Sequence, residues 1–398
     1  MDSPHDIPAF AQRLRCFIKQ TAGEGRGPIP DPSEETTGIG NEGFERLALE
    51  LFALQFEYNP PYRKFCQKLG RTPFGIEHWS QIPALPPEAF KDFELTSLSP
   101  LERTLVFHSS GTTAQRPSRH FHCAESLKLY EDSLLPWFQR HLLARPADVA
   151  WPLRVQVIAL TPRSELAPNS SLVHMFETVT REFGAQGSSF VGTLGQDGAW
   201  ELDYGKLVSA LNASIAREGP VLLLGTAFLF VHLLEHFGRE ELRLALPAGS
   251  RLMETGGYKG RSLALSKPEL YCRLTDRLGV GVESIIGEYG MSELSSQAYD
   301  LAFTGTRQKA RDDATALQQR SFRFPPWSRA QIVSPETGRE VGGGEPGVLR
   351  IFDLANAWSA LAIQTQDIAV KRGNGFELVG RAATAEPRGC SLMSADSL

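Results

Sequence analysis

The sequence predicts an α/β fold with a mostly parallel β-sheet body, followed by a small β-rich subdomain. Between Arg154 and Gly287, short apolar segments alternate with segments whose apolar residues have helical spacing. Strands that alternate with helices of this length form parallel βαβ units, in which helices cover the sheet. Beyond Phe322 only short apolar segments remain, and turn-forming residues such as those at Arg372–Gly375 separate them. The 398 residues are enough for a large core.

The segment before this body is predicted to be helical with one interruption. A helix is expected at Phe10–Ile18, and residues 22–43 mix Gly, Pro and acidic residues as an exposed linker does. Apolar residues at helical spacing predict a second helix at Phe44–Tyr58. The Pro-Pro pair at 60–61 ends that helix, and a further helix is expected at Tyr62–Leu69.

The remaining elements follow from the two patterns described above. The predicted strands of the body are Val155–Leu160, Ser188–Val191, Val221–Leu224, Arg251–Glu254 and Ser284–Gly287. The predicted helices between them are Leu172–Phe183, Leu207–Ala216, Phe228–Phe237 and Pro268–Leu278. The predicted strands of the subdomain are Ala330–Val333, Gly347–Phe352, Leu361–Ile363, Ile368–Lys371 and Phe376–Val379. We therefore expect a helix and linker at 1–43, the body at 44–320 and the subdomain at 321–398.

Composition and charge exclude several classes of protein. A hydrophobic content of 41% and a charged content of 22% are ordinary for a soluble chain. The net charge of -5 and the lack of basic runs predict no nucleic-acid partner. The start, Met1–Asp6, does not resemble a secretory signal, and the most apolar segment, Val221–Leu234, is too short to span a bilayer. Five scattered cysteines predict neither disulfides nor zinc, so a cytoplasmic protein is expected.

A polar loop at Phe107–Arg119 is the first candidate for chemistry. Hydroxyl residues surround a glycine, and two arginines, Arg116 and Arg119, follow. The central residues are Ser109, Ser110, Gly111, Thr112 and Thr113. Such a loop offers donors, positive charge and a backbone that can curve around a phosphate, although an ordinary surface turn is the alternative. It is not a Walker A loop, because no Gly-Lys-Ser/Thr follows.

Two further loops follow predicted strands, where ligands of parallel sheets bind. The first contains Gly256, Gly257 and Lys259. The second contains Gly287, Glu288, Tyr289, Gly290, Met291, Ser292 and Glu293. Glycines allow a flat ligand to approach the backbone, the Tyr289 ring can stack on a base, and a Glu293 oxygen can bind Mg²⁺. A solvated carboxylate at a helix start is the alternative for Glu293.

These loops resemble the motifs of adenylate-forming enzymes. The polar loop is similar to their Ser/Thr-Gly-Thr-Thr phosphate loop, and Tyr289–Glu293 matches their Tyr-Gly-x-Ser/Thr-Glu motif. Gln364–Asp367 resembles their Thr-Gly-Asp motif, and Gly380–Arg381 resembles the Gly-Arg that follows. The resemblance implies ATP and Mg²⁺ as cofactors, with Asp367 on the ribose. The chain departs from the pattern in two places, because the loop lysine is missing and Gln366 replaces a glycine.

A narrower resemblance is to the LuxE-type acyl-protein synthetases, over about residues 80–395. It rests on Ser109–Thr113, Ser118–Arg119, Glu254–Gly257, Lys259–Arg261, Gly290–Gln297 and Arg388–Leu392. Such enzymes activate a fatty acid, carry the acyl group on a C-terminal cysteine and deliver it to a fatty acid reductase. Cys390 occupies the matching position. Because the sequence ends 17 residues after Arg381, the mobile lid domain of other adenylate-forming enzymes is expected to be absent.

The resemblance leaves several roles as hypotheses. Lys259 is the candidate cation in place of the missing lysines, and Arg119 or Arg116 could supply phosphate-loop charge. The candidate acyl-binding residues are His174, Gly225 and Phe228, although core packing is the alternative for all three. Two other functions stay open. One is a ligase that transfers the acyl group to coenzyme A, an amine or a carrier, and the other is a scaffold that binds nucleotide or acyl ligand without turnover.

Overall fold

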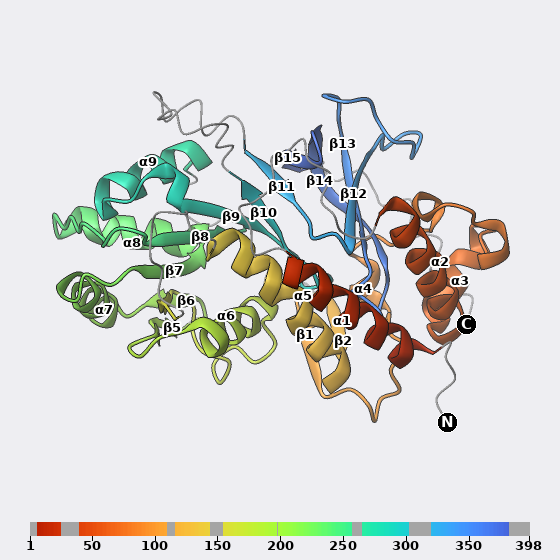
Figure 1. Cartoon of the computed structure of the whole chain (residues 1–398), viewed down its shortest axis with the longest axis horizontal. Coiled ribbons are helices and arrows are strands. Elements are labelled where there is room, and N and C mark those ends of the chain that lie inside the picture. Colours follow the sequence, from red (N-terminus) through yellow and green to blue (C-terminus); the bar gives the residue numbers. More distant parts are fainter. Residues whose placement is uncertain are drawn as a thin grey trace. The chain divides into compact units, whose positions relative to one another are not determined.

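The computed structural model describes residues 6–24, 40–109, 116–143, 154–196, 198–256, 265–301 and 320–381. The chain divides into two compact units, whose helices and strands are labelled in Figure 1. Unit 1 comprises Met1–Trp137, Met291–Gln297 and Arg323–Leu398. Unit 2 comprises Phe138–Gly290 and Ala298–Phe322. Each unit is therefore built from separate stretches of chain, and the domain boundaries expected at residues 43 and 320 stay predictions.

Unit 2 contains the predicted parallel sheet. Its strands are β3 (Gln156–Ala159), β4 (Ser189–Phe190), β7 (Val221–Thr226), β8 (Arg251–Thr255), β9 (Ile285–Tyr289) and β10 (Ala298–Leu301). They lie in the order β10-β9-β8-β7-β3-β4. Neighbours from β4 to β9 are parallel, and β10 is antiparallel to β9. All five predicted strands of the body are thus present, and because they are parallel their carboxyl ends meet at one edge.

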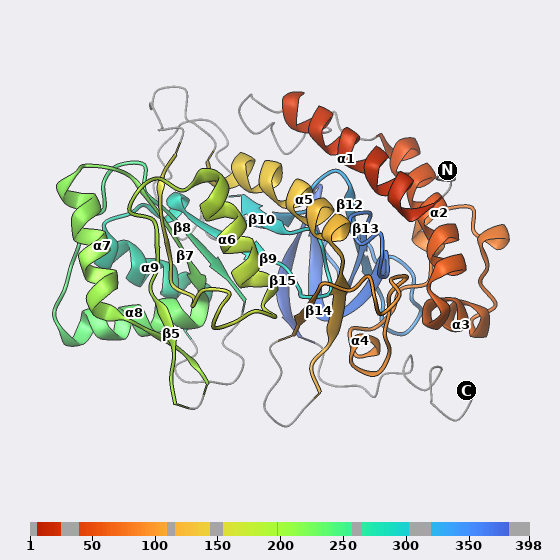
Figure 2. The same ribbon diagram turned by 90° about the horizontal axis from the view of Figure 1, so that it is seen from below.

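Helices cover both faces of this sheet (Figure 2). They are α6 (Ser171–Phe183), α7 (Tyr204–Ala216), α8 (Ala227–Arg239) and α9 (Lys267–Leu278). The apolar sides of α7, α8 and α9 form one buried cluster with alternate residues of the strands, such as Leu223 and Leu252. Helix α6 packs on β3, and none of its side chains belongs to that cluster. A small hairpin of β5 (Gly192–Leu194) and β6 (Trp200–Leu202) completes the unit.

Helix starts in unit 2 are fixed by side-chain caps. Thr226, the last residue of β7, accepts a hydrogen bond at Oγ1 from the backbone N–H of Leu229, at 3.2 Å. Asp203 accepts from the N–H of Lys206 at the start of α7, at 3.0 Å. Each cap satisfies one of the donors that a helix start leaves unpaired. The apolar segment from Val221 is therefore a buried strand that turns directly into a helix, as its length predicts.

Unit 1 combines N-terminal helices with two antiparallel sheets. The helices are α1 (Ile7–Glu24), α2 (Asn41–Tyr58), α3 (Pro60–Lys68) and α4 (Ala89–Asp92). The strands are β1 (Leu105–His108), β2 (Arg119–His122), β12 (Ser328–Val333), β13 (Pro346–Asp353), β14 (Ala362–Arg372) and β15 (Gly375–Arg381). Strands β1 and β2 form one hairpin, and β12 to β15 pair antiparallel in chain order. The last four strands confirm the predicted β-rich C-terminal part.

The remaining elements are short or join the two units along the chain. Three short 3₁₀ helices lie at Pro73–Gly75, Trp79–Gln81 and Val282–Ser284. Helix α5 (Ala124–Leu142) begins in unit 1 and ends in unit 2, and β11 (Ser321–Arg323) runs from unit 2 back into unit 1. Within the described residues, no helix combines the length and the apolar character needed to cross a membrane.

Buried amide side chains tie α2 to a turn far along the chain. Gln55 donates from Nε2 to the carbonyl of Asn356 at 2.8 Å, and its Oε1 accepts from the N–H of Leu361 at 2.9 Å. Asn59 donates from Nδ2 to the carbonyl of Ser359 at 3.0 Å. Asn59 also accepts from the N–H of Tyr62, so it caps the start of α3. The Pro-Pro pair at 60–61 therefore ends one helix and begins the next.

Some predicted elements need correction. The two strands expected at Leu361–Ile363 and Ile368–Lys371 are one strand, β14, whose pairing with β15 shifts between Ile368 and Ala369. Such an irregularity bends a strand and disrupts its ladder locally without ending the strand. The helix expected at Phe10–Ile18 is longer at both ends. Helix α5 was not predicted, because Pro136 inside it is a residue that usually ends a helix.

Candidate active site

The β1–β2 hairpin brings together the two ends of the predicted phosphate loop. The N–H of Ser109 donates to the carbonyl of Ser118 at 3.3 Å, and the N–H of Ser118 donates to Oγ of Ser109 at 3.0 Å. These bonds continue the ladder in which His108 pairs with Arg119. The central loop residues lie outside the described part of the chain, namely Ser110, Gly111, Thr112 and Thr113. The hairpin thus fixes where the loop begins and ends.

The Ser292–Glu293 part of the second motif lies against this hairpin, within unit 1. The hydroxyl oxygens of Ser118 and Ser292 are 3.4 Å apart. His120 donates from Nδ1 to the carbonyl of Ser292 at 2.9 Å. Burial lowers the pKa of His120 to about 4, so the ring is neutral and its proton sits on Nδ1. Two motifs that are 172 residues apart along the chain are therefore in contact.

Glu293 is the carboxylate of that motif and is almost completely buried, with an exposed fraction of 4%. Its Oε2 accepts a hydrogen bond from Oγ of Ser292 at 3.0 Å. Its backbone carbonyl accepts from Nδ2 of Asn356 at 2.9 Å. The sequence alternative of a solvated carboxylate at a helix start does not hold, because Glu293 is buried and no helix begins there.

Arg119 has an acidic partner beside the phosphate loop. Its Nη1 lies 3.4 Å from Oε1 of Glu94, while Arg103 makes a shorter bond of 2.6 Å to Oε2 of the same carboxylate. The hydrogen bond from Arg103 is the main reason why the pKa of Glu94 is lowered. Both guanidinium groups also lie over the ring of Phe121. Arg119 is therefore held at the end of the loop with only a long contact to an anion.

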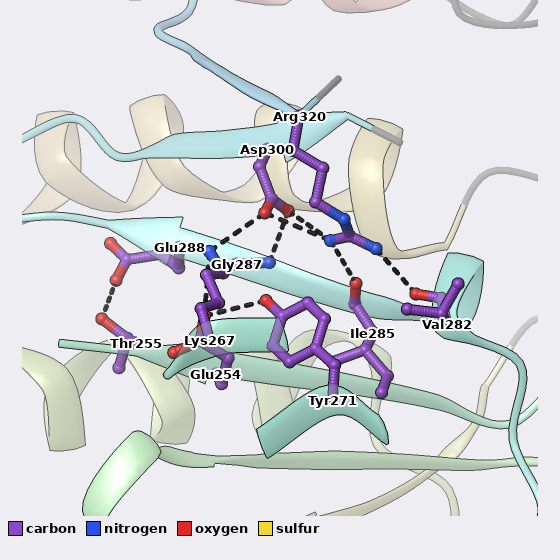
Figure 3. Close-up of polar contacts among 10 residues, drawn as sticks. All are labelled: Glu254, Thr255, Lys267, Tyr271, Val282, Ile285, Gly287, Glu288, Asp300 and Arg320. Carbon is purple, nitrogen blue, oxygen red and sulfur yellow. Dashed lines mark hydrogen bonds and ion pairs between the residues drawn. The ribbon is translucent and has the colours of Figure 1, made fainter. Parts of the chain in front are cut away.

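Unit 2 carries a separate polar cluster at the carboxyl ends of β8 and β9 (Figure 3). Oε1 of Glu254 accepts from the hydroxyl of Tyr271 at 2.8 Å and lies 3.1 Å from Nζ of Lys267. The hydroxyl of Thr255 donates to Oε2 of Glu288. Burial raises the pKa of Glu288 to about 7, the Thr255 hydroxyl opposes this shift, and the charge of Glu254 adds to it. Glu288 is therefore a carboxyl group that titrates near neutral pH.

The same cluster contains a buried ion-pair network. Asp300 on β10 accepts from both Lys267 and Arg320, each at 3.1 Å, and Arg320 also donates to the carbonyls of Ile285 and Val282 at 2.7 Å. Burial alone would raise the pKa of Asp300, but the two cations outweigh it and hold that pKa below its usual value. For Lys267, burial lowers the pKa, and the carboxylates of Asp300 and Glu254 raise it by more.

Two positions where glycine was predicted to admit a ligand, 256 and 287, are glycine for different structural reasons. Gly256 has a φ of +74°, a backbone conformation that favours glycine. A Cβ at this position would meet no atom within 4 Å, so the lack of space is not the reason for the glycine. At Gly287 a Cβ would lie 2.4 Å from Nζ of Lys267 and 2.8 Å from Oδ2 of Asp300. Gly287 therefore makes room for the ion pair, and its role in nucleotide binding stays a prediction. Gly257 and Lys259 lie outside the described residues.

Comparison with known proteins assigns the chain to a family. The family model described as "Acyl-protein synthetase, LuxE" matches residues 40–398. The chain belongs to the LuxE acyl-protein synthetase family. The family predicted from the motifs, and with it the ligase class, is confirmed.

Curated relatives of this LuxE-family chain match it over most of their length. A long-chain-fatty-acid–luciferin-component ligase of Vibrio harveyi is 23% identical over 363 residues, which are 87% of this chain and 86% of that protein. The ligase of the same name from Aliivibrio fischeri is 22% identical over 378 residues, 88% of each. Both names designate ligases that act on a long-chain fatty acid.

Solved structures confirm the predicted fold of the LuxE-family chain. An open conformation of 2-hydroxyisobutyryl-CoA ligase with 2-HIB-AMP and CoA has a TM-score of 0.58 and 13% identity, and covers 89% of this chain and 75% of that one. The same ligase in a postadenylation state with 2-HIB-AMP also has a TM-score of 0.58, with 14% identity and coverages of 89% and 73%. At this identity the likeness concerns the fold, which is that of the adenylate-forming ligases. The expected absence of a lid stays a prediction.

Other motif residues of the LuxE-family chain lie where β14 and β15 pair. Asp367 and Arg381 are opposite each other in the ladder, and Nε of Arg381 donates to Oδ1 of Asp367 at 3.0 Å. The N–H of Asp367 also donates to Oγ1 of Thr365 at 3.1 Å. The Arg381 side chain has an exposed fraction of 72%, and that of Asp367 has 15%. The two residues that the sequence singled out separately are therefore direct partners.

The acyl-binding candidates lie on three different elements of unit 2. Gly225 is on β7, where a Cβ would lie 2.8 Å from Cδ1 of Leu160, so packing against Leu160 explains its lack of a side chain. Phe228 on α8 packs edge to face against His232, with ring centroids 4.3 Å apart. His174 lies on α6, which covers the other face of the sheet from α8. Their role in acyl binding stays a prediction, and Cys390 lies outside the described residues.

Several residues of these sites were not predicted from the sequence. They are His120, Lys267, Asp300, Arg320 and Asp353. The alternation His120-Phe121-His122 was the one local signal, because residues two apart in a strand face the same side. The other four have partners that are distant in the sequence, which no local pattern reveals. Within the described residues, no group of three or more acidic, His or Cys side chains is arranged to hold a metal.

Proposed function

We propose that this protein uses ATP to convert a fatty acid to an acyl-adenylate and then transfers the acyl group to the thiol of Cys390. The observation that carries the proposal is the buried carboxylate of Glu293, which contacts Ser292 beside the hairpin of the phosphate loop. Burying a carboxylate costs free energy unless the carboxylate is paired with a cation or coordinates a metal ion. The membership in the LuxE family supports the same chemistry.

The donor set around Glu293 fits a nucleotide-bound Mg²⁺. Oε2 accepts from Ser292, whereas no donor among the described residues contacts Oε1. Proteins bind Mg²⁺ at such sites through one or two carboxylates, and substrate phosphates and water complete the shell. The lack of a larger ligand group in the described residues agrees with this mode. When bound, the ion neutralises charge on the phosphates.

The remaining roles are assigned from the motif matches. We propose that the polar loop, with Ser109, Thr112 and Thr113, binds the phosphates and that Arg119 exchanges its 3.4 Å contact with Glu94 for a phosphate oxygen. Tyr289 would stack on the adenine beside Gly256, and Asp367, oriented by Arg381, would bind the ribose hydroxyls. Lys259 stays the candidate cation for the missing lysines. In the first step a carboxylate oxygen forms a bond to the α-phosphorus of ATP, the bond from that phosphorus to the bridging oxygen breaks, and pyrophosphate leaves. Such a catalyst mainly positions the carboxylate and the α-phosphate and stabilises negative charge.

The second step needs a thiolate. After Cys390 loses its proton, its sulfur forms a bond to the acyl carbon, the bond from that carbon to the phosphate oxygen breaks, and AMP leaves. The product is an acyl thioester on the enzyme. The names of the curated relatives support a long-chain acid as substrate. We propose that the thioester is then delivered to a fatty acid reductase or an acyl carrier.

Labelling of the protein tests this proposal. Purified protein is incubated with labelled tetradecanoic acid, ATP and Mg²⁺, and is then analysed on a denaturing gel with and without hydroxylamine. The variants are Cys390→Ser and, as a matched control, Cys272→Ser, which changes an exposed cysteine. We expect hydroxylamine-labile label on the wild type and on Cys272→Ser, none on Cys390→Ser, and ATP–pyrophosphate exchange in all three.

Other outcomes contradict the proposal in different ways. Undiminished label on Cys390→Ser would show that a residue other than Cys390 carries the acyl group. Formation of acyl-CoA, with no labelled protein, would favour the ligase that uses coenzyme A. Binding of ATP without pyrophosphate exchange for a panel of acids would favour a scaffold without turnover.

A further inference from the structure

The segment that follows Glu293 is held by one buried carboxylate. Oδ2 of Asp353 accepts from the backbone N–H groups of Ser295 and Ser296, at 3.0 and 2.8 Å. Oδ1 accepts from the hydroxyl of Ser296 at 2.7 Å. All of these residues belong to unit 1. Three donors from Ser295 and Ser296, the second and third residues after Glu293, therefore converge on one side chain of strand β13.

Asp353 has no charge partner that would explain its burial. It is the last residue of β13, and its exposed fraction is 0%. Its fourth hydrogen bond comes from the N–H of Ala355, at 3.1 Å, and no Lys or Arg of the described chain forms an ion pair with it. Burial raises the pKa of Asp353 to about 6, and the hydrogen bonds of the serines oppose that shift. Its contacts are thus almost entirely with the segment that follows Glu293.

A series of hydrogen bonds, from the Trp327 indole through two serine hydroxyls, ends at the same segment. Nε1 of Trp327 donates to Oγ of Ser133 at 2.7 Å, and the oxygens of Ser133 and Ser296 are 2.9 Å apart. Because Ser296 gives its own proton to Asp353, Ser133 must donate to Ser296. Hydrogen bonds therefore run in one direction from Trp327 to Asp353. A network in which each member has a fixed direction resists rearrangement.

The turn after Asp353 holds Glu293 itself. Asn356 donates from Nδ2 to the carbonyl of Glu293 at 2.9 Å, and its own N–H donates to the carbonyl of Asp353 at 3.1 Å. Asp353 and Asn356 are therefore parts of one turn. That turn binds the backbone at Glu293 and at the two serines that follow.

We propose that Asp353 is a positioning residue, which holds the Glu293 carboxylate in place by fixing the Ser295–Ser296 backbone. The inference rests on the proposed function, in which Glu293 binds the Mg²⁺ of the nucleotide complex. Partners that orient a metal ligand, without touching the metal, commonly change affinity or rate by about 10- to 100-fold when they are replaced. The nearest residue to Glu293 that Asp353 contacts is Ser295, two positions further along the chain.

The variant Asp353→Asn tests this role. Asparagine keeps the shape but directs an NH₂ group at N–H or O–H donors, so the serine segment must shift. We expect ATP–pyrophosphate exchange to fall about 10- to 100-fold. We also expect Mn²⁺, measured by electron paramagnetic resonance with a non-hydrolysable ATP analogue, to bind more weakly. Ser296→Ala, which removes one donor and keeps the carboxylate, should give a smaller change in the same direction.

A double-mutant cycle separates positioning from general damage. If Asp353 acts through Glu293, adding Asp353→Asn to Glu293→Gln should not weaken Mn²⁺ binding further. Asp132→Asn is the matched control, because Asp132 forms ion pairs with Arg15 and Lys128 in the same unit and contacts neither Glu293 nor the serine segment among the described residues. We expect this control to leave exchange and Mn²⁺ binding unchanged. Thermal unfolding of each variant shows how much of any loss of exchange or of Mn²⁺ binding results from a less stable protein.

The outcomes distinguish this inference from the function on which it rests. Loss of exchange in Glu293→Gln, with unchanged exchange in both Asp353→Asn and Ser296→Ala, would overturn the positioning role and leave the proposed function intact. Additive losses of Mn²⁺ binding in the double mutant would also overturn it. Unchanged exchange and Mn²⁺ binding in Glu293→Gln would instead contradict the metal role of Glu293 itself.

Discussion

The ammonium group of Lys267 and the carboxylate of Asp300 lie 3.1 Å apart across a position of β9 that has no side chain, Gly287. The N–H of Gly287 also donates to Oδ1 of Asp300 at 2.5 Å. The Asp300 carboxylate therefore accepts from one backbone N–H and from the side chains of Lys267 and Arg320. This arrangement explains why position 287 has no side chain, while the predicted role of Gly287 in nucleotide binding stays a prediction.

Replacing Gly287 with alanine should destabilise the protein. The new methyl group would lie 2.8 Å from Oδ2 of Asp300, a side chain with little freedom to move. We expect the free energy of unfolding in urea to fall by about 1–3 kcal/mol, as for other overpacked positions. Gly219→Ala, where a Cβ meets no atom within 4 Å, is the matched control and should change it little. An equal effect of both substitutions would contradict this explanation.

Asp300→Asn should have a larger effect, because it leaves the buried Arg320 without its carboxylate partner and the partly exposed Lys267 with Glu254 alone. Breaking a buried pair by removing one partner typically costs about 3–5 kcal/mol. The control is Asp276→Asn, at the exposed Arg243–Asp276 pair of 2.9 Å, and it should cost less than about 1 kcal/mol. Urea unfolding of both variants measures the difference. If both substitutions lowered the free energy of unfolding by similar amounts, the Asp300 network would contribute no more to stability than an exposed ion pair.

The stability of the protein should depend on pH through Glu288. Its pKa of about 7 in the folded state lies above the usual glutamate value of 4.5, so between these values the folded state holds a proton that the unfolded state has lost. This group's contribution to stability is therefore complete below pH 4.5 and falls as pH rises towards 7, by at most ~1.4 kcal/mol per pH unit. Unfolding of wild type and Glu288→Gln from pH 4.5 to 7.5 measures it. The difference between them should decrease with rising pH, and a constant difference would refute the prediction.

Arg381→Ala should separate nucleotide binding from stability. Arg381 pairs with Asp367 on the surface, and an exposed pair contributes less than about 1 kcal/mol. We expect a nearly unchanged unfolding free energy but a higher KM for ATP in pyrophosphate exchange. Arg372→Ala, which removes the similar exposed pair with Glu377, is the control for KM. An unchanged KM in Arg381→Ala would argue against a role of this pair at the ribose.

The sequence was sufficient where local pattern decides the structure. Val221–Leu224 is fully buried on both faces of the sheet, and four consecutive apolar residues predict that. The Tyr289–Glu293 motif is contiguous, so it was found from sequence. By contrast, strand β2 carries His120 and His122, whose burial depends on partners such as Ser292, 172 residues away. Asp353 likewise has no local signal, because the serines that it binds lie 57 and 58 residues earlier.

The amide bonds of Gln55 and Asn59 also constrain how the chain folds during its synthesis. Their partner carbonyls, at Asn356 and Ser359, are made at least 300 residues later, after all of unit 2. Until then the amide groups of Gln55 and Asn59 lack these partners, although α2 can already pack against α1 and α3. Contacts of such long sequence separation form slowly. Unit 1 therefore cannot form these hydrogen bonds before residues 356 to 359 are synthesised, and a nascent chain interrupted before residue 356 lacks them.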